Sequence, residues 1–286
     1  MQLKSAVDAA YELLVANDVP SPRLNAELLM MFVLGRERAY LYAHPERELS
    51  SEEQYRYDQV IRERAEGCPT QYITGHQEFW GLDLLVSPAV LIPRPETEHV
   101  VETVLDLLKE FPLEPAAAGK LRMVDVGTGS GAIALALASE LPQAEIHAGD
   151  ISPEALEIAQ VNAARSAMDS RIRFRKSDLL AAYPKGIFDF VISNPPYVGE
   201  LEADRVQRQV REYEPRIAVF SGERGLDVYR RLIPQAQEAL KPGGWLVMEI
   251  GFSTEESVRE LLAGWDDVRV TPDLQGIPRV IAARKP

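Results

Sequence analysis

The sequence predicts an α/β fold in which a small helical region precedes a parallel sheet with helices on both faces. From residue 121 onward, apolar runs of strand length alternate with segments of helical periodicity, which is the pattern of repeated β-α units. The residues before 70 show helical periodicity only, and glycines then punctuate aromatic and β-branched residues as in a hairpin. We therefore expect a helical N-terminal domain at 1–72, a β-hairpin linker at 73–94 and the α/β domain at 95–286.

Three segments of the first domain carry an apolar stripe at helical spacing: residues 3–18, 24–35 and 50–67. The second ends at Gly35, which suits a C-terminal cap. The third begins with Ser50 and Glu53 in the spacing of a capping box and ends at Gly67. Helices of this length can bury a small common core, so a separate helical domain is predicted.

Glycine and proline mark the linker and the elements after it. Gly75 and Gly81 bound the run "HQEFW" and predict the hairpin, and Pro95 suits the first turn of a helix in "PETEHVVETVLDLLKEF". The segment "PLEPAAAGK" is predicted to be a loop. Beyond it, strands are predicted at 121–127, 144–150, 171–178, 187–194, 244–251, 267–272 and 279–284. Helices are predicted at 131–141, 152–167 and 226–240 and after Ser253.

The charge of the chain disfavours DNA or RNA as a substrate. The formal net charge is −13, whereas enzymes that act on nucleic acids usually display a basic surface that neutralises phosphates. The basic run "RIRFRK" at 171–176 alternates like a strand, so its charges are interpreted as one solvated face of that strand.

Cysteine and histidine usage excludes several kinds of site. Cys68 is the only cysteine, which excludes an intrachain disulfide and a multi-cysteine zinc site and favours a structural thiol. His44, His76, His99 and His147 show no metal-binding spacing, so no metal site is expected. No apolar stretch approaches the ~20 residues of a membrane span, and the N-terminus resembles no targeting peptide, so a soluble cytoplasmic protein is expected.

A glycine loop follows the first predicted strand of the α/β domain. "MVDVGTGSGAIALALA" places Gly127, Gly129 and Gly131 between a buried strand and a helix, where glycine lets the backbone turn sharply and lets a ligand approach. The next strand ends at Asp150, and an acid there can accept hydrogen bonds from both ribose hydroxyls of an adenosine cofactor. Together they predict a nucleotide-type cofactor.

Two cofactor classes fit this loop. With Ala132, the loop satisfies the dinucleotide pattern, which leaves NAD open. The form D-x-G-x-G-x-G, from Asp125 to Gly131, resembles motif I of the class I S-adenosylmethionine-dependent methyltransferases. That resemblance implies a Rossmann-like sheet that is mostly parallel with an antiparallel last strand. The spacing within the loop does not decide between the two classes.

The segment "SNPPYV" (193–198) follows an apolar run whose strand must end there, because proline cannot donate to a sheet ladder. Its tetrapeptide "NPPY" (194–197) resembles the signature of methyltransferases that act on a planar, non-basic amino nitrogen. The Asn194 side-chain oxygen and the Pro195 carbonyl would then accept hydrogen bonds from the amino hydrogens. Pro195 and Pro196 would fix the loop, and Tyr197 would stack on the substrate. This motif favours S-adenosylmethionine over NAD.

Further segments resemble one family in particular, the PrmC/HemK peptide chain release factor glutamine methyltransferases. They are "PTQYITGHQEFWG" (69–81), "LIPRPETE" (91–98), "DVGTGSG" (125–131), "SNPPYV" (193–198), "EP" (214–215), "GLDVYRRLI" (225–233), "LKPGGWLVMEIG" (240–251) and "DLQGIPRV" (273–280). The resemblance covers nearly the whole chain. It implies methylation of the side-chain amide nitrogen of the glutamine in the Gly-Gly-Gln motif of release factors, with the helical domain docking the substrate.

The resemblance also implies roles for individual residues. The cofactor would be bound by Asp125, Gly127, Thr128, Gly129, Ser130, Gly131, Asp150, Asp178, Leu179 and Asn194. In that pattern the glycine loop would hold the methionine part, Asp150 the ribose, and Asp178 with Leu179 the adenine. The catalytic residues would be Asn194, Pro195, Pro196 and Tyr197, which would hold the glutamine. No metal would be required.

The segment "PRPETE" keeps an open role. Arg94 lies near the cofactor pocket in such a fold, and an ion pair with Glu96 or Glu98 at the pocket mouth is expected.

Two other functions also stay open. The same tetrapeptide serves enzymes that methylate DNA adenine or ribosomal RNA guanine, which the net charge and the lack of an inserted target-recognition domain disfavour. An inactive cofactor-binding scaffold is disfavoured because the loop, the acid and the tetrapeptide occur together. A monomer with a protein substrate, and without a direct nucleic-acid substrate or membrane association, is expected.

Overall fold

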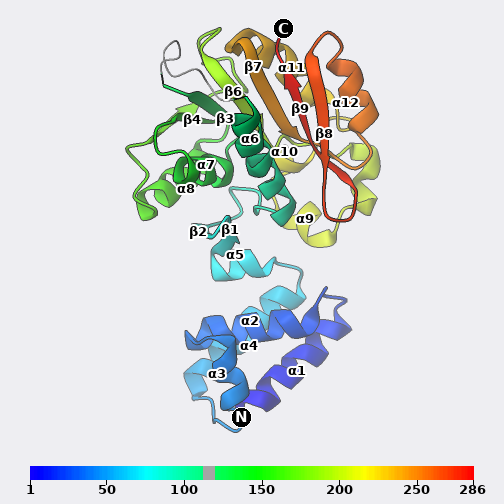
Figure 1. Cartoon of the computed structure of the whole chain (residues 1–286). Coiled ribbons are helices and arrows are strands. Elements are labelled where there is room, and N and C mark those ends of the chain that lie inside the picture. The colour runs from blue at the N-terminus through cyan, green and yellow to red at the C-terminus, as the bar shows by residue number, and fades with distance from the viewer. Residues whose placement is uncertain (112–119) are drawn as a thin grey trace. The chain divides into compact units, whose positions relative to one another are not determined.

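The computed structural model describes residues 1–111 and 120–286. The chain divides into two compact units (Figure 1). The first comprises Met1–His76 and Arg208–Tyr213, and the second comprises Gln77–Gln207 and Glu214–Pro286. Apart from Lys120, the predicted loop "PLEPAAAGK" lies outside the described residues. Within the described ranges, no helix is long and apolar enough to cross a membrane.

The first unit is helical: α1 (Leu3–Ala16), α2 (Pro22–Leu34), α3 (Arg38–Ala43), α4 (Ser51–Ala65), α5 (Thr70–Thr74) and α9 (Arg208–Tyr213). Both predicted caps are confirmed, because Gly35 ends α2 with a φ of 59° and Ser50 and Glu53 form a capping box at α4. Apolar side chains of α1, α2 and α4 form one core. Within it, the buried Tyr57 hydroxyl donates to the Ala26 carbonyl at 2.9 Å.

Helix α9 joins this unit from far along the chain, and a buried arginine of α4 binds it. Arg64 is 4% exposed and donates to Asn25 Oδ1 and to Gln209 Oε1 of α9, both at 2.9 Å. It also donates to the Cys68 carbonyl at 3.0 Å. These partners are neutral, so hydrogen bonds alone compensate the buried guanidinium. Burial raises the pKa of the Cys68 thiol to about 12, as expected of a structural thiol.

A seven-stranded sheet forms the centre of the second unit: β3 (Arg122–Val126), β4 (Glu145–Asp150), β5 (Ile172–Lys176), β6 (Phe188–Ser193), β7 (Leu240–Glu249), β8 (Asp266–Pro272) and β9 (Pro278–Arg284). The strand order is β5-β4-β3-β6-β7-β9-β8. Neighbours from β5 to β7 pair in parallel, and β9 is antiparallel to both β7 and β8. The predicted mostly parallel sheet with an antiparallel last strand is confirmed. The predicted hairpin is the two-stranded sheet of β1 (His76–Phe79) and β2 (Leu82–Leu85).

Helices cover both faces of the sheet (Figure 1). The helices that contribute to the apolar clusters on these faces are α6 (Glu98–Glu110), α7 (Ala132–Glu140), α8 (Pro153–Arg165), α11 (Asp227–Ala239) and α12 (Glu255–Leu261). The unit also contains the short helices η1 (Pro95–Thr97), η2 (Glu200–Arg205) and α10 (Arg216–Val219). Because side chains alternate along a strand, Met123 of β3 packs with α6 and α7, whereas the adjacent Val124 packs with α11 and α12. The sequence predicted none of the short helices α3, α5, α9 and α10, whose six residues or fewer show no periodicity.

The strand order places a ligand crevice between β3 and β6. From β3 the chain proceeds through β4 to β5, and then returns to the other side of β3 at β6. In open α/β sheets, ligands bind outside the carboxyl ends of strands at such a switch of direction. The glycine loop follows β3 and "SNPPYV" begins with the last residue of β6, so both motifs lie at this position.

Candidate active site

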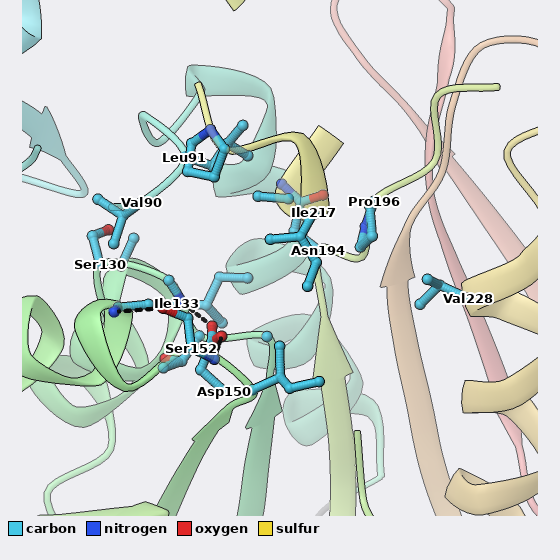
Figure 2. Close-up of a pocket in the computed structure, with 18 of the residues that line it drawn as sticks. Val90, Leu91, Ser130, Ile133, Asp150, Ser152, Asn194, Pro196, Ile217 and Val228 are labelled. Atoms are coloured by element: carbon cyan, nitrogen blue, oxygen red, sulfur yellow. Dashed lines mark hydrogen bonds between the residues drawn. The ribbon is translucent and has the colours of Figure 1, made fainter. Parts of the chain in front are cut away.

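A pocket opens at the carboxyl ends of β3, β4 and β6, and all of its lining residues belong to the second unit (Figure 2). Nine residues predicted from the sequence line it: Gly127, Thr128, Gly129, Ser130, Asp150, Asp178, Leu179, Asn194 and Pro196. Four predicted residues are not in its wall: Asp125, Gly131, Pro195 and Tyr197. Figure 2 shows Asp150 and Ser152 on one side and Asn194 and Pro196 on the other.

The glycine loop presents bare backbone to the pocket. Gly127 and the residue after it both donate to the Gly149 carbonyl, at 2.8 and 2.9 Å, which turns the chain back over β4. Gly129 has a φ of 55°, and a Cβ there would meet no atom within 4 Å, so the space beside it is open. Gly131 serves packing instead, because a Cβ there would come within 3.3 Å of the Ala159 Cβ on α8.

Asp150, the last residue of β4, fixes the glycine loop. Its Oδ2 accepts the backbone N–H of Gly129 and its Oδ1 accepts that of Ser152, both at 2.9 Å. Burial raises the pKa of Asp150, although these two hydrogen bonds act in the opposite direction. A carboxylate has about four acceptor positions, so Asp150 can hold the loop and still accept hydrogen bonds from a ligand.

Asp125 lies behind the loop rather than in the pocket wall. It is 1% exposed, and its Oδ2 accepts a hydrogen bond from the Thr128 hydroxyl at 2.6 Å. Burial raises the pKa of Asp125 to about 7. The structure therefore places Asp125 where it supports the loop that lines the pocket.

The wall between β5 and α11 combines an ion pair with apolar side chains. The Asp178 carboxylate accepts a hydrogen bond from Arg231 of α11 at 2.6 Å. Leu179 has a φ of 51°, and the next backbone N–H donates to Gln235 Oε1 at 2.9 Å, which holds this turn. Leu179 and Ile151 thus provide an apolar surface beside two polar side chains.

Asn194 is anchored through its amide nitrogen. Its Nδ2 donates to the Thr97 hydroxyl at 3.0 Å, and that hydroxyl donates to Glu249 Oε2 at 2.6 Å. The Tyr197 hydroxyl donates to Glu249 Oε1 at 3.1 Å. Within the described part of the chain, Asn194 Oδ1 has no hydrogen-bond partner. Asn194, which lines the pocket, therefore keeps an acceptor that no other described side chain uses.

Part of the tetrapeptide 194–197 is buried and packs against the domain core. Pro195 is buried and Pro196 lines the pocket. The Tyr197 ring packs on the apolar cluster of α11 and β7, and a Cβ at Gly251 would come within 2.9 Å of it. The ring of Tyr197 is thus part of the support beneath the loop.

The predicted ion pair of Arg94 with Glu96 or Glu98 is wrong. Arg94 pairs instead with Glu214, a buried residue whose other oxygen accepts the Ile92 backbone N–H at 3.3 Å. Arg94 has extended backbone before η1, and the Glu98 carboxylate accepts the backbone N–H of a hairpin residue at 2.8 Å. The acid that Arg94 needs lies 120 residues further along the chain.

Several lining residues had no predicted role. Thr97 of η1, Val90 and Leu91 before it, Ile217 of α10 and Val228 of α11 all line the pocket. Thr97 lies within "PRPETE", a motif that the sequence singles out without indicating that Thr97 lines the pocket. The apolar residues carry no local signal, because only the fold brings these segments together.

The histidines do not gather into a metal site. Over residues 1–111 and 120–286, no group of three or more His, Cys, Asp or Glu side chains could hold a metal ion. His147 on β4 has edge contacts with the rings of Tyr183 and Phe188, and burial lowers its pKa. Its Nε2 also lies 3.0 Å from Glu145 Oε1, so His147 is held by ring packing and by this contact.

Comparisons with protein families and curated proteins agree along the chain. Residues 5–75 match the family model of the PrmC N-terminal domain, and residues 105–212 match that of the methyltransferase small domain. A release factor glutamine methyltransferase of Koribacter versatilis (strain Ellin345) is 58% identical over 287 residues, covering 100% of this chain and 99% of the relative. One of Moorella thermoacetica (strain ATCC 39073 / JCM 9320) is 42% identical over 286 residues, covering 99% and 98%.

Comparison with solved structures bears on the fold. The hMettl16 catalytic domain in complex with MAT2A 3′UTR hairpin 1 has a TM-score of 0.57 and 21% sequence identity, covering 79% of this chain and 80% of that chain. At this identity the likeness establishes a shared fold and no more.

Proposed function

The chain belongs to the family of release factor glutamine methyltransferases, and from this we propose that it transfers a methyl group from S-adenosylmethionine to the side-chain amide nitrogen of a release factor glutamine. The proposed target is the glutamine of the Gly-Gly-Gln motif. The observation that carries this proposal is the unused Asn194 Oδ1 at the pocket that the glycine loop and Asp150 also line.

The residues of the pocket fit S-adenosylmethionine. The open space beside Gly129 accommodates a ligand against the loop backbone, and Asp150 supplies acceptors for ribose hydroxyls. Leu179 and Ile151 offer an apolar surface for an adenine ring, with the Asp178 carboxylate nearby for its polar edge. When bound, S-adenosylmethionine supplies a methyl group already activated on a sulfonium.

The chain's own contribution is to position the substrate amide. An amide nitrogen is a poor nucleophile because its lone pair is delocalised into the carbonyl. Asn194 Oδ1 and the Pro195 carbonyl would accept hydrogen bonds from the two amide hydrogens and so orient the nitrogen. Prolines fix these acceptors in advance, and alignment of reacting groups can lower a barrier by up to roughly 7–11 kcal/mol in favourable cases.

We propose that the first unit docks the release factor. Its residues line no part of the pocket. Residues 1–72 would form the docking domain, 73–94 the hairpin linker and 95–286 the catalytic domain. A protein substrate needs a contact area far larger than one glutamine side chain provides.

The test is mass spectrometry of a purified release factor after incubation with the enzyme and S-adenosylmethionine. One added methyl group, located by fragmentation on the glutamine of the Gly-Gly-Gln peptide, is the expected result. A matched release factor with that glutamine changed to alanine should stay unmodified. Methylation of added DNA or ribosomal RNA, with the release factor unmodified, would contradict the proposal and establish the nucleic-acid alternative.

A further inference from the structure

Thr97, in the "PRPETE" segment, uses its hydroxyl in a long-range contact. It ends η1 and leads directly into α6 with helical backbone angles, φ −67° and ψ −19°. Here it caps no N–H. The residue is 3% exposed, and its hydroxyl donates to Glu249 Oε2 at 2.6 Å instead. The hydroxyl thus joins η1 to the end of β7, 152 residues further along the chain.

Glu249, the last residue of β7, is a buried carboxylate held by hydroxyl groups. It is 2% exposed, with Thr97 on one oxygen and Tyr197 on the other at 3.1 Å. No arginine or lysine of the described chain lies within ion-pair distance of it. Burial raises the pKa of Glu249, and the hydrogen bonds from Thr97 and Tyr197 act in the opposite direction by stabilising its charged form, which can only accept. In the structure both hydroxyls donate to this carboxyl group, so the single proton of Thr97 is directed toward Glu249.

This direction of donation determines which way the Asn194 amide faces. With its proton committed to Glu249, the Thr97 oxygen can only accept. Asn194 can then approach it through NH₂ but not through its carbonyl oxygen, which agrees with the 3.0 Å contact from Nδ2. Oδ1 is consequently left for another donor.

We propose that Thr97 and Glu249 are positioning residues for the methyl transfer, because the carboxylate orients the hydroxyl and the hydroxyl orients the Asn194 amide. This inference rests on the proposed function, in which Asn194 Oδ1 accepts a hydrogen bond from the substrate amide. A flipped Asn194 would present NH₂ to the substrate NH₂, donor against donor. In that orientation Asn194 would repel the substrate amide instead of accepting its hydrogen bond.

The decisive variants are Thr97→Val and Thr97→Ser. Valine keeps the shape of threonine but removes the hydroxyl, so kcat on the release factor should fall about tenfold or more. The KM for the release factor and the affinity for S-adenosylhomocysteine, measured by calorimetry, should stay within a factor of about two, since neither depends on the amide orientation. Serine restores the hydroxyl and should restore most of kcat.

Thr103→Val is the matched control, because this threonine lies on α6 and its hydroxyl donates to the His99 carbonyl at 2.7 Å, away from the pocket. It should leave kcat unchanged. Equal loss in the valine and serine variants of Thr97, or a parallel loss in Thr103→Val, would overturn the inference. So would retention of more than half of kcat by Thr97→Val.

Glu249→Gln provides a second, nearly isosteric test should Thr97→Val fail to fold. A glutamine amide can donate as well as accept, so it no longer commits the Thr97 proton, and kcat should fall several-fold with cofactor affinity retained. Wild-type kcat in this variant would overturn the inference. Failure of the wild-type enzyme to methylate the release factor would instead reject the proposed function, so the two failures are distinguishable.

Discussion

The two sides of the pocket are held in place by different kinds of contact. On the side of the glycine loop, the Asp150 carboxylate accepts backbone N–H groups of Gly129 and Ser152, which lie 21 and 2 residues away. On the other side, Asn194 is held by Thr97, 97 residues away, and Thr97 is held by Glu249, 152 residues away. On the first side, one carboxylate holds backbone N–H groups, whereas on the second, side chains from three separate elements hold one another.

This difference suggests that cofactor binding and substrate positioning respond to separate changes. The loop is held by backbone hydrogen bonds to Gly149 and by the carboxyl groups of Asp150 and Asp125, so its geometry should survive substitutions on the Asn194 side. The Asn194 side depends on individual hydroxyl, carboxylate and amide groups, each of which one substitution can remove.

The largest effect is expected on the second side. Asn194→Ala should lower the methylation rate by about 100-fold or more at saturating cofactor, because the substrate amide loses an acceptor and its alignment. Asn194→Asp keeps an acceptor oxygen but places a charge opposite a neutral amide, so it should be impaired less than the alanine variant. Methyl incorporation into release factor measures the rate. If calorimetry shows cofactor affinity falling in parallel, the two sides are not separate.

A smaller effect is expected on the first side. Asp150→Ala should weaken binding of S-adenosylhomocysteine about tenfold or more, because hydrogen bonds to a charged acceptor are lost and the loop N–H groups lose their partner. Turnover at saturating cofactor should change by no more than a few-fold. Calorimetric titration measures the affinity, and an unchanged affinity would remove Asp150 from the cofactor site.

The smallest effect on methylation is expected for Asp125→Asn. This substitution should instead change how the free energy of unfolding depends on pH. Because burial raises the pKa of Asp125 to about 7 in the folded chain, its contribution to stability is fully present below its ordinary value of 3.8 and is lost as the pH rises through about 7. The asparagine variant carries no such charge. Its free energy of unfolding relative to wild type should therefore rise from pH 5 toward pH 7, by up to roughly 1.4 kcal/mol per pH unit while Asp125 stays protonated in the folded wild type. Urea unfolding at several pH values measures this, and a pH-independent difference would contradict it.

The same contrast explains what the sequence revealed. The glycine loop, Asp150 and the capping box at Ser50 depend on residues close in sequence or on the regular β-α repeat, and all were predictable. Arg94 was assigned a partner within four residues, yet its acid is Glu214, which only the folded chain brings near. Thr97 and Glu249 were missed for the same physical reason, since neither has a local signal of its hydrogen bonds.

Helix α9 bears on how this protein can be dissected or recombined. The helical unit consists of two pieces of chain, and Gln209 of the second piece is a hydrogen-bond partner of the buried Arg64 in the first. A fragment that starts after the hairpin would keep Arg208–Tyr213 but lose every helix against which it packs. A chimera made by a single crossover at the hairpin would combine α9 of one parent with helices α1 to α5, including the buried Arg64, of the other. The helical unit is therefore inherited as a discontinuous module, and only an exchange that carries both pieces transfers it intact.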